Sequence, residues 1–340
     1  PINQVNADVM PNHFLDHPYT CDVMFYEAFA EEEAALRRFL PATCRAGFTE
    51  ATLQAAAEDL PPAPLLSIRT QSVVPETWFP RVHGLLARTT GYDHLQRYRA
   101  LAPPPGLACL PEYCSRAVAE QAALLWLALL RRLPSQISQW PRFDRSGLTG
   151  GECLGRRLVV AGVGRIGHDV IQIGRGLGMD TVGVDVVARH PDVRYLPGPE
   201  AFAQADVVAA CMDLNPTSRH FFRAETFRSF KPGSLLVNVA RGELVHTPDL
   251  IHALDQGLLG GAALDVFDDE TCIADTLRGL APPHPEVDRL RQLAGHPRVI
   301  LTPHNAFNTS EAVERKSQFS AEQVVHFLQH RQFRWPWPGA

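Results

Sequence analysis

The sequence predicts an α/β protein with two domains, each built on a parallel β-sheet that helices cover. The chain has 340 residues, which is enough for two domains that each bury a core. In both halves, short apolar runs typical of buried strands alternate with longer helix-like runs, which is the pattern of βαβ units. A Gly-rich turn at residues 162–167 lies near the start of the second series.

The first series occupies the first third of the chain. The run VMFY at 23–26 is typical of a buried strand. Residues 31–40 begin with acidic side chains and end with basic ones, which favours a helix because the charges oppose the helix dipole. Further strands are predicted at 65–68, 84–87 and 107–110, and a further helix at 52–59.

Residues 117–133 predict one strong helix that is apolar on nearly all sides. Such a helix should be buried. Two interpretations remain open at this point, a contact between domains or subunits and a long helix within one core.

The second series begins at Arg157 with a strand that leads into the Gly-rich turn, followed by a helix over 165–177 and a strand over 181–184. Later strands are predicted at 207–211, 234–239, 262–266 and 299–302. Residues 271–296 form a partly Pro-rich insertion between the last two strands. A loop of this length in a compact domain is usually functional or disordered.

The composition excludes several classes of function. A net charge of −5 gives no reason to expect nucleic acid or an anionic membrane as a partner. The most apolar run, 122–130, is too short to cross a bilayer, and residues 1–14 lack the features of a signal peptide. The seven cysteines form no CxxC pair and no zinc-ligand spacing. We therefore expect a cytoplasmic protein with reduced thiols and no metal site.

The Gly-rich turn has the pattern GxGxxG, from Gly162 to Gly167, directly after a strand and at the start of a helix. The first glycine permits a tight turn, the second lets the backbone approach a pyrophosphate, and the third lets helix and strand pack closely. The free N–H groups of the helix start can bind the phosphates. Alone, this motif is a weak indication of a dinucleotide site.

Asp185 ends the next strand, eighteen residues after Gly167. A carboxylate at this place can accept hydrogen bonds from the adenosine ribose and repel a 2′-phosphate, which favours NAD over NADP. Arg189, just beyond it, could reduce this discrimination. The alternative is an ordinary acidic turn residue.

Three polar residues follow strands of the second series, namely Arg241, Glu270 and His304. In parallel sheets, ligands bind at the carboxyl ends of the strands. Taken singly, each residue has an ordinary interpretation: a surface ion pair, a loop acid and a structural histidine.

In this order, the motifs GxGxxG, Asp185, Ala240-Arg241-Gly242, DVFDDE at 265–270 and TPH at 302–304 resemble the D-isomer-specific 2-hydroxyacid dehydrogenase family. Residues 86–95 (LARTTGYDHL) and 110–121 (LPEYCSRAVAEQ) also resemble family segments. The stretch TPHNAFNTSEAV, with the insertion before it, is most similar to the D-lactate dehydrogenase branch.

The resemblance implies a Rossmann NAD-binding domain over 118–308. It also implies a flavodoxin-like substrate domain over 1–117, completed by 309–340 with a helix around 320–330. A cleft is expected between the domains, and a homodimer through the cofactor domain.

The implied reaction is the NAD-dependent reduction of a small 2-oxo acid, with pyruvate as the first guess, to the D-2-hydroxy acid. Arg241 would bind the substrate carboxylate through two hydrogen bonds and polarise the carbonyl. His304 would donate a proton to the carbonyl oxygen, and Glu270 would orient His304 and favour its protonated form.

The remaining predicted contacts are cofactor and substrate contacts. The cofactor contacts are Gly162, Gly164, Arg165, Ile166, Gly167, Asp185, Met212, Asp213, Val239, Ala240 and Asp265. The substrate contacts are Thr90, Gly91, Tyr113, Arg241, His304 and Phe307, and Arg69 is a weaker candidate. One departure concerns Cys211-Met212-Asp213, because the family commonly has His, an apolar residue and Pro there. It puts in doubt how these positions meet the nicotinamide ribose.

Two alternatives remain open. The first is a reductase of glyoxylate, hydroxypyruvate or a branched 2-oxo acid. The second is an NADH-sensing binding protein with the same fold. The complete set of Arg241, Glu270 and His304 argues against the sensor, which would need only the cofactor site.

Overall fold

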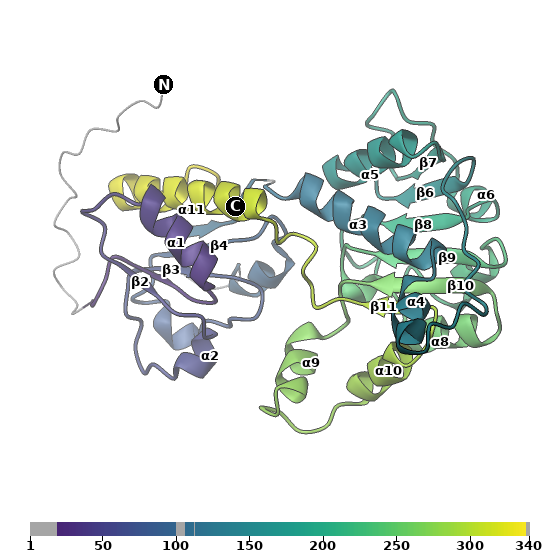
Figure 1. Ribbon diagram of the computed structural model, residues 1–340. Coiled ribbons are helices and arrows are strands. Elements are labelled where there is room, and N and C mark those ends of the chain that lie inside the picture. The colour runs from purple at the N-terminus through teal and green to yellow at the C-terminus, as the bar shows by residue number, and fades with distance from the viewer. Residues whose placement is uncertain (1–18, 100–105, 112, 338–340) are drawn as a thin grey trace. The chain divides into compact units, whose positions relative to one another are not determined.

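The computed structural model describes residues 19–99, 106–111 and 113–337. The N-terminal stretch considered above for a signal peptide lies outside these residues. The chain forms two compact units, one of residues 1–114 with 309–340 and one of residues 115–308. Each unit has its own parallel sheet (Figure 1), so the predicted α/β fold class is confirmed.

Five parallel strands form the sheet of the first unit, in the order β2-β1-β3-β4-β5. Their bounds are β1 Val23–Phe25, β2 Ala46–Phe48, β3 Leu65–Ile68, β4 Gly84–Ala87 and β5 Gly106–Ala108. The sequence analysis does not predict β2, because its three residues AGF are half-buried and lie at the edge of the sheet, where no apolar run is required.

In the described part of this unit there are three α-helices: α1 Ala30–Phe39, α2 Leu53–Ala56 and α11 Ser310–His330. The helix predicted at 52–59 is wrong beyond Ala56, because Ala57 has a left-handed backbone (φ 51°) that ends it. The C-terminal helix is longer than predicted. It begins after Thr309, whose side chain caps it by accepting from the Ala312 N–H.

A group of buried charges joins the two long helices of the first unit. Glu32 of α1 pairs with Arg88 at 2.8 Å and with Lys316 of α11 at 3.0 Å, and all three side chains are at most 2% exposed. Burial alone would raise the pKa of Glu32, but the charges of Arg88 and Lys316 lower it to about 2. Burial lowers the pKa of Lys316 to about 8, although Glu32 opposes this shift.

Six parallel strands form the sheet of the second unit, in the order β11-β10-β9-β8-β6-β7. Their bounds are β6 Arg157–Ala161, β7 Asp180–Val184, β8 Val207–Ala210, β9 Ser234–Asn238, β10 Leu259–Leu264 and β11 Val299–Leu301. Strand β10 begins earlier than predicted. Its Gly260 interrupts the apolar run in the sequence, but a Cβ atom there would lie 2.1 Å from the Gly233 carbonyl oxygen, so the close strand packing requires glycine.

The helices of the second unit are α3 Ser115–Leu130, α4 Leu133–Gln139, α5 Arg165–Gly176, α6 Gly198–Phe202, α7 Ala224–Arg228, α8 Thr247–Asp255, α9 Glu270–Leu277 and α10 Pro285–Ala294. Helix α3 packs beside α5 and against β9 and β10 (Figure 1). It is buried on most sides as expected, but Leu124 is 55% exposed, so the expectation of complete burial is wrong there.

The expectation of a long loop at 271–296 is wrong, because helices α9 and α10 occupy most of this segment. Four apolar side chains anchor these helices to the second unit: Ile273, Val287, Leu290 and Leu293. Their spacing is helical, but the prolines at 282, 283 and 285 hide it in the sequence. Among the described helices, none has the length and apolar character needed to cross a membrane.

Candidate active site

The three glycines of the GxGxxG turn differ in what surrounds them. Gly162 has φ +90°, and a Cβ atom there would lie 2.4 Å from the Met212 backbone. A Cβ atom at Gly167 would lie 2.1 Å from the carbonyl oxygen of Gly162, so this position permits only glycine where α5 begins. Around Gly164, by contrast, nothing within 4 Å would meet a Cβ atom. The turn therefore packs tightly at its first and third glycines and is open at the second, where a ligand can approach.

A cavity of about 700 Å³ opens at this turn, at the carboxyl ends of β6, β7 and β8. Of the predicted cofactor contacts, Gly162, Gly164, Asp185, Met212 and Asp213 line it. The remaining wall combines apolar side chains such as Val184 and Phe202 with hydroxyl groups such as Thr217 and Ser218. This size and mixture are typical of a site for a small organic cofactor.

Asp185 lies at the end of β7, where its two carboxylate oxygens accept backbone hydrogen bonds. Oδ2 accepts from the Val163 N–H at 2.6 Å and Oδ1 from the Val187 N–H at 3.1 Å. These bonds hold the carboxylate against the Gly-rich turn, on the wall of the cavity. Arg189 lines the same cavity.

The segment Cys211-Met212-Asp213 follows β8 and forms the part of the cavity wall next to Gly162 of the Gly-rich turn. The Cys211 N–H donates to the Ala161 carbonyl at 2.7 Å, and Ser218 Oγ donates to the Asp213 carbonyl at 2.7 Å. Burial raises the pKa of the Cys211 thiol to about 12, so this side chain is neutral. The segment thus places a neutral thiol beside Met212 and the acidic side chain of Asp213 on the cavity wall.

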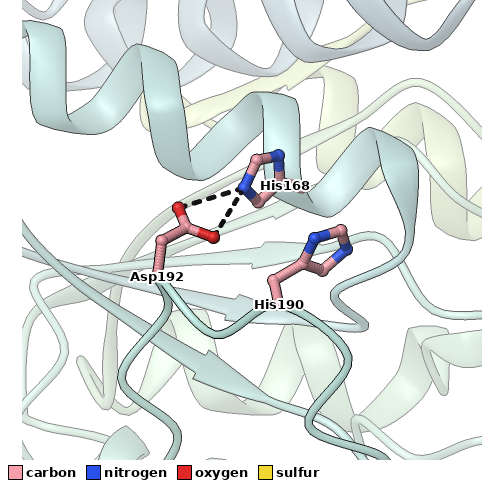
Figure 2. A group of neighbouring side chains, drawn as sticks. All are labelled: His168, His190 and Asp192. Atoms are coloured by element: carbon pink, nitrogen blue, oxygen red, sulfur yellow. Dashed lines mark hydrogen bonds and ion pairs between the residues drawn. The ribbon is translucent and has the colours of Figure 1, made fainter.

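His190 and Asp192 lie in the segment after Asp185, which also carries Arg189, and both contact His168 of α5. Figure 2 shows His168 of α5 beside His190 and Asp192, with His168 Nε2 3.1 Å from both Asp192 oxygens. The two imidazole rings are stacked, 4.2 Å apart and 17° from parallel. A ring nitrogen offers its lone pair in the ring plane, so stacked rings do not direct two lone pairs at one metal ion. Arg175 also donates to Asp192 at 2.8 Å. We interpret the group as a clamp that fixes the segment after β7 to α5.

Arg241 lies in the turn after β9. Asn238 holds this turn, because its Nδ2 donates to the Arg241 carbonyl at 2.8 Å and its Oδ1 accepts from the Ala240 N–H at 3.1 Å. A Cβ atom at Gly242 would lie 1.7 Å from the carbonyl carbon of Phe267. Glycine at 242 therefore allows the turn of Arg241 to contact the backbone at Phe267, three residues before Glu270.

Glu270 and His304 form a direct pair. Glu270 is the first residue of α9, and its Oε2 lies 2.6 Å from Nδ1 of His304, while its Oε1 accepts from the Phe267 N–H at 3.2 Å. Both side chains are partly exposed, 24% for Glu270 and 30% for His304. His304 has a left-handed backbone (φ 49°), which is uncommon for a residue with a side chain and is concentrated at functional sites. Because Nδ1 faces Glu270, Nε2 is the nitrogen that can exchange a proton with a ligand.

Asp265 has a positioning role that the sequence analysis does not foresee. Its buried carboxylate accepts from Thr302 Oγ1, from the Asn305 N–H at 3.0 Å and from the Ala306 N–H at 2.8 Å. Its carbonyl accepts from the His304 N–H at 2.7 Å. Burial raises the pKa of the Asp265 carboxyl, and the bonds from the loop oppose this shift. Asp265 thus fixes the loop that presents His304, and its predicted contact with the cofactor stays a prediction.

Several predicted contacts lie outside the wall of the 700 Å³ cavity: Arg165, Ile166, Gly167, Val239 and Ala240. The predicted substrate contacts are divided between the units. Thr90, Gly91 and Tyr113 belong to the first unit, and Arg241, His304 and Phe307 to the second. Within the second unit, the rings of His304 and Phe307 lie 6.0 Å apart.

Several known proteins resemble this chain. Residues 123–306 match the family described as D-isomer specific 2-hydroxyacid dehydrogenase, NAD binding domain. The chain is 30% identical over 339 residues to 2-hydroxyacid dehydrogenase A of Aspergillus oryzae, covering 96% of this chain and 92% of that protein. It is 35% identical over 233 residues to a D-lactate dehydrogenase of Streptococcus agalactiae, covering 65% of this chain and 68% of the relative.

Solved structures give the same fold. A D-lactate dehydrogenase from Aquifex aeolicus, solved with NAD and lactic acid, superposes with a TM-score of 0.80. The two chains are 24% identical, and the match covers 92% of this chain and 99% of the Aquifex chain.

Proposed function

The chain belongs to the D-isomer specific 2-hydroxyacid dehydrogenases and is an NAD-dependent oxidoreductase, and we propose that it reduces a small 2-oxo acid, with pyruvate the first candidate, to the D-2-hydroxy acid. The observation that carries this proposal is the pair of His304 and Glu270, 2.6 Å apart, on the unit that also forms the dinucleotide cavity. A histidine held by a carboxylate is the arrangement that proton transfer to a carbonyl requires.

The residues of the cavity fit the cofactor. The open space at Gly164 leaves room for the pyrophosphate, and the start of α5 offers N–H groups to it. Asp185 would accept from the adenosine ribose. When bound, the cofactor would supply hydride chemistry, as the donor in its reduced form and as the acceptor in its oxidised form.

The chain's own residues would perform the remaining chemistry. The Arg241 guanidinium would grip the carboxylate of the substrate through two hydrogen bonds and so orient the adjacent carbonyl. Nε2 of protonated His304 would donate to the carbonyl oxygen, while Glu270 holds the ring through Nδ1. In the oxidation direction, the neutral imidazole would accept the proton from the hydroxyl group.

The predicted substrate contacts in the first unit are polar and aromatic. The hydroxyl oxygen of Thr90 is buried and has no hydrogen-bond partner among the described residues, so a substrate carboxylate could accept from it. The ring of Tyr113 is buried, and the ring of Phe307, in the second unit, is partly exposed. Aromatic walls favour small apolar side chains and offer no charge to a second carboxylate.

A panel of 2-oxo acids tests this function through the loss of NADH absorbance. We expect pyruvate and slightly larger apolar acids all to react, with kcat/KM values that differ by roughly 10- to 200-fold per methylene at most, because one methylene in an apolar pocket is worth about 1–3 kcal/mol. Phe307→Ala should move the preference toward bulky acids such as phenylpyruvate. Oxaloacetate is the charged control. A strong preference for oxaloacetate, glyoxylate or hydroxypyruvate would replace the pyruvate assignment, and no turnover with any 2-oxo acid would favour an NADH-sensing protein.

Asp185 provides a second prediction, on cofactor choice. Asp185→Asn keeps an oxygen that can accept from the Val163 N–H but removes the charge that repels a 2′-phosphate. We expect the preference for NADH over NADPH, measured as the ratio of kcat/KM values, to fall roughly 10-fold or more. Asp169→Asn, on the adjacent helix and outside the cavity wall, should leave the ratio unchanged. An unaltered ratio in Asp185→Asn would show that this side chain does not reach the ribose.

We also propose that the protein is a homodimer in the cytoplasm. Large apolar side chains are exposed along the segment that follows α3: Ile137 (66%), Trp140 (71%), Phe143 (69%) and Leu154 (75%). Trp140 and Phe143 contact each other, with ring centroids 5.9 Å apart. An apolar surface of this kind is typical of an interface between chains. The seven free thiols suit a reducing compartment.

Replacing two residues of this surface tests the dimer. Trp140→Asp with Phe143→Asp should convert a dimer into a monomer, measured by sedimentation velocity, because each substitution would bury a charge in an apolar contact. Leu280→Asp is the matched control, since Leu280 is 70% exposed and lies outside this segment. A wild-type protein that sediments as a monomer at micromolar concentration would contradict the proposal.

A further inference from the structure

A second cavity, of about 630 Å³, lies at the amino edge of the six-stranded sheet in the second unit. It shares no lining residue with the dinucleotide cavity. Strand β9 begins in it at Ser234, and Asp206 and Arg298 directly precede β8 and β11. The end of α3 and the start of α4 complete the wall.

The charge of this cavity is strongly positive, although the whole chain is acidic. Four cationic side chains and a single carboxylate line it, so its net formal charge is +3, against −5 for the chain. These five side chains are Arg132, Arg156, Lys231, Arg298 and Asp206. Low-dielectric walls around charges of one sign concentrate the field and attract an anion.

The single carboxylate does not neutralise all four cations. Asp206 lies 2.7 Å from Lys231 Nζ and 3.5 Å from Arg156. Arg132 and Arg298 instead donate to backbone carbonyls, those of Gly147 at 3.0 Å and Leu254 at 3.5 Å. A carbonyl oxygen has no net charge, so the positive charges of these two arginines remain for a ligand.

Ser234 gives an independent indication of a ligand. Its side chain is 2% exposed and lines the cavity, yet its Oγ has no hydrogen-bond partner among the described residues. Buried hydroxyl groups nearly always have a partner, and an oxygen of a bound anion would provide one. The hydroxyl groups of Ser135 and Thr149 line the same space.

We propose that this cavity binds a small organic molecule with two phosphate groups, at a site separate from the active site. Guanidinium groups bind phosphate through two parallel hydrogen bonds, which suits two arginines that pair with no carboxylate among the described residues. A single phosphate would fill little of 630 Å³ and would balance only part of the charge. Two phosphates on a small carbon skeleton fit both the volume and the charge.

Such a ligand would join parts of the unit that are far apart in sequence. Arg132 follows α3, Ser234 begins β9 and Arg298 precedes β11. At their other ends, β9 leads to Arg241 and β11 to His304. Binding should therefore stabilise the unit that carries the proposed catalytic residues, because a ligand that binds only the folded state shifts the unfolding equilibrium.

The test is thermal unfolding of the full chain with saturating NADH, which keeps phosphate compounds out of the dinucleotide cavity. The probes are glucose 1,6-bisphosphate, glucose 6-phosphate and inorganic phosphate, at equal ionic strength set with NaCl. At a concentration ten times its Kd, the bisphosphate should raise the Tm by roughly 3–6 °C. The monophosphate and inorganic phosphate should raise it clearly less. Equal shifts for all three would overturn the two-phosphate assignment, and no shift would overturn the site.

Variants then locate the effect. Arg132→Gln and Arg298→Gln should each remove most of the Tm rise, whereas Arg291→Gln, on the exposed surface of α10, should keep it. In the absence of phosphate, all three variants should oxidise NADH with a 2-oxo acid at the wild-type rate. This activity would show that the variants are folded. The Tm shift does not depend on turnover, so a failure of the proposed site can be distinguished from a failure of the proposed function. A full Tm rise in both cavity variants would overturn the proposal.

Discussion

Replacing His304 with alanine is expected to lower the turnover of 2-oxo acid reduction by roughly 10²–10⁴-fold, the usual contribution of a general acid. The reason is geometric. Nδ1 of His304 lies 2.6 Å from Glu270, and the loop that carries His304 is fixed by three hydrogen bonds to the Asp265 carboxylate. Without the imidazole, no proton donor is held there, whereas the predicted cofactor contacts are unchanged.

The binding of NADH separates this role from a structural one. Quenching of protein fluorescence by NADH should give a Kd for His304→Ala close to that of the wild type. Glu270→Gln keeps a hydrogen-bond acceptor for His304 but loses the charge, so we expect a smaller loss of turnover than in His304→Ala. His296→Ala, in the turn before β11, is the control and should retain full turnover. Wild-type turnover in His304→Ala would refute the assignment.

The sequence predicts the strands of the second unit well, because a strand that is buried on both faces must be an unbroken apolar run. The runs LVVA and SLLVN are of this kind, and β6 and β9 lie within a residue of the prediction. Strand β2 is not predicted from the sequence, because an edge strand does not need an unbroken apolar run. Helices α9 and α10 are not predicted either. Prolines interrupt their apolar spacing, and prolines in a sequence usually indicate a loop.

Within the candidate site, residues that follow strands can be foreseen, but the contacts that position them cannot. His304 and Glu270 are separated by 34 positions, and Glu270 begins a helix that continues into the segment expected to be a loop. Gly242 and Asp265 position the turn of Arg241 and the loop of His304. Gly242 lies in the sequence motif ARG and Asp265 in ALDVF. The motifs alone do not predict which backbone segment Gly242 will contact.

The charges buried between α1 and α11 predict the largest effect on stability. In Glu32→Gln, the buried Arg88 and Lys316 would lose the carboxylate that both contact. Breaking a buried ion pair by removing one partner usually costs about 3–5 kcal/mol in the free energy of unfolding. We therefore expect the urea midpoint of unfolding to fall markedly. Glu33→Gln is the matched control, since this neighbour pairs with Arg37 on the surface of the same helix, and such pairs contribute less than about 1 kcal/mol.

The pH dependence of unfolding identifies the cause of this loss. The pKa of Glu32 is about 2 in the folded protein, against an ordinary value of 4.5, so the unfolded chain binds its proton at higher pH. The stabilisation from this group is therefore complete above pH 4.5 and is lost as the pH falls toward 2. The pKa of Lys316 is lowered from 10.5 to about 8, so stability should also rise between pH 8 and pH 10.5, where only the unfolded chain holds that proton. In Glu32→Gln the acid-side loss due to this group should vanish, because no carboxylate remains to be protonated. If wild type and Glu32→Gln lose stability in parallel below pH 4.5, the loss of stability in acid is due to other carboxylates and not to Glu32.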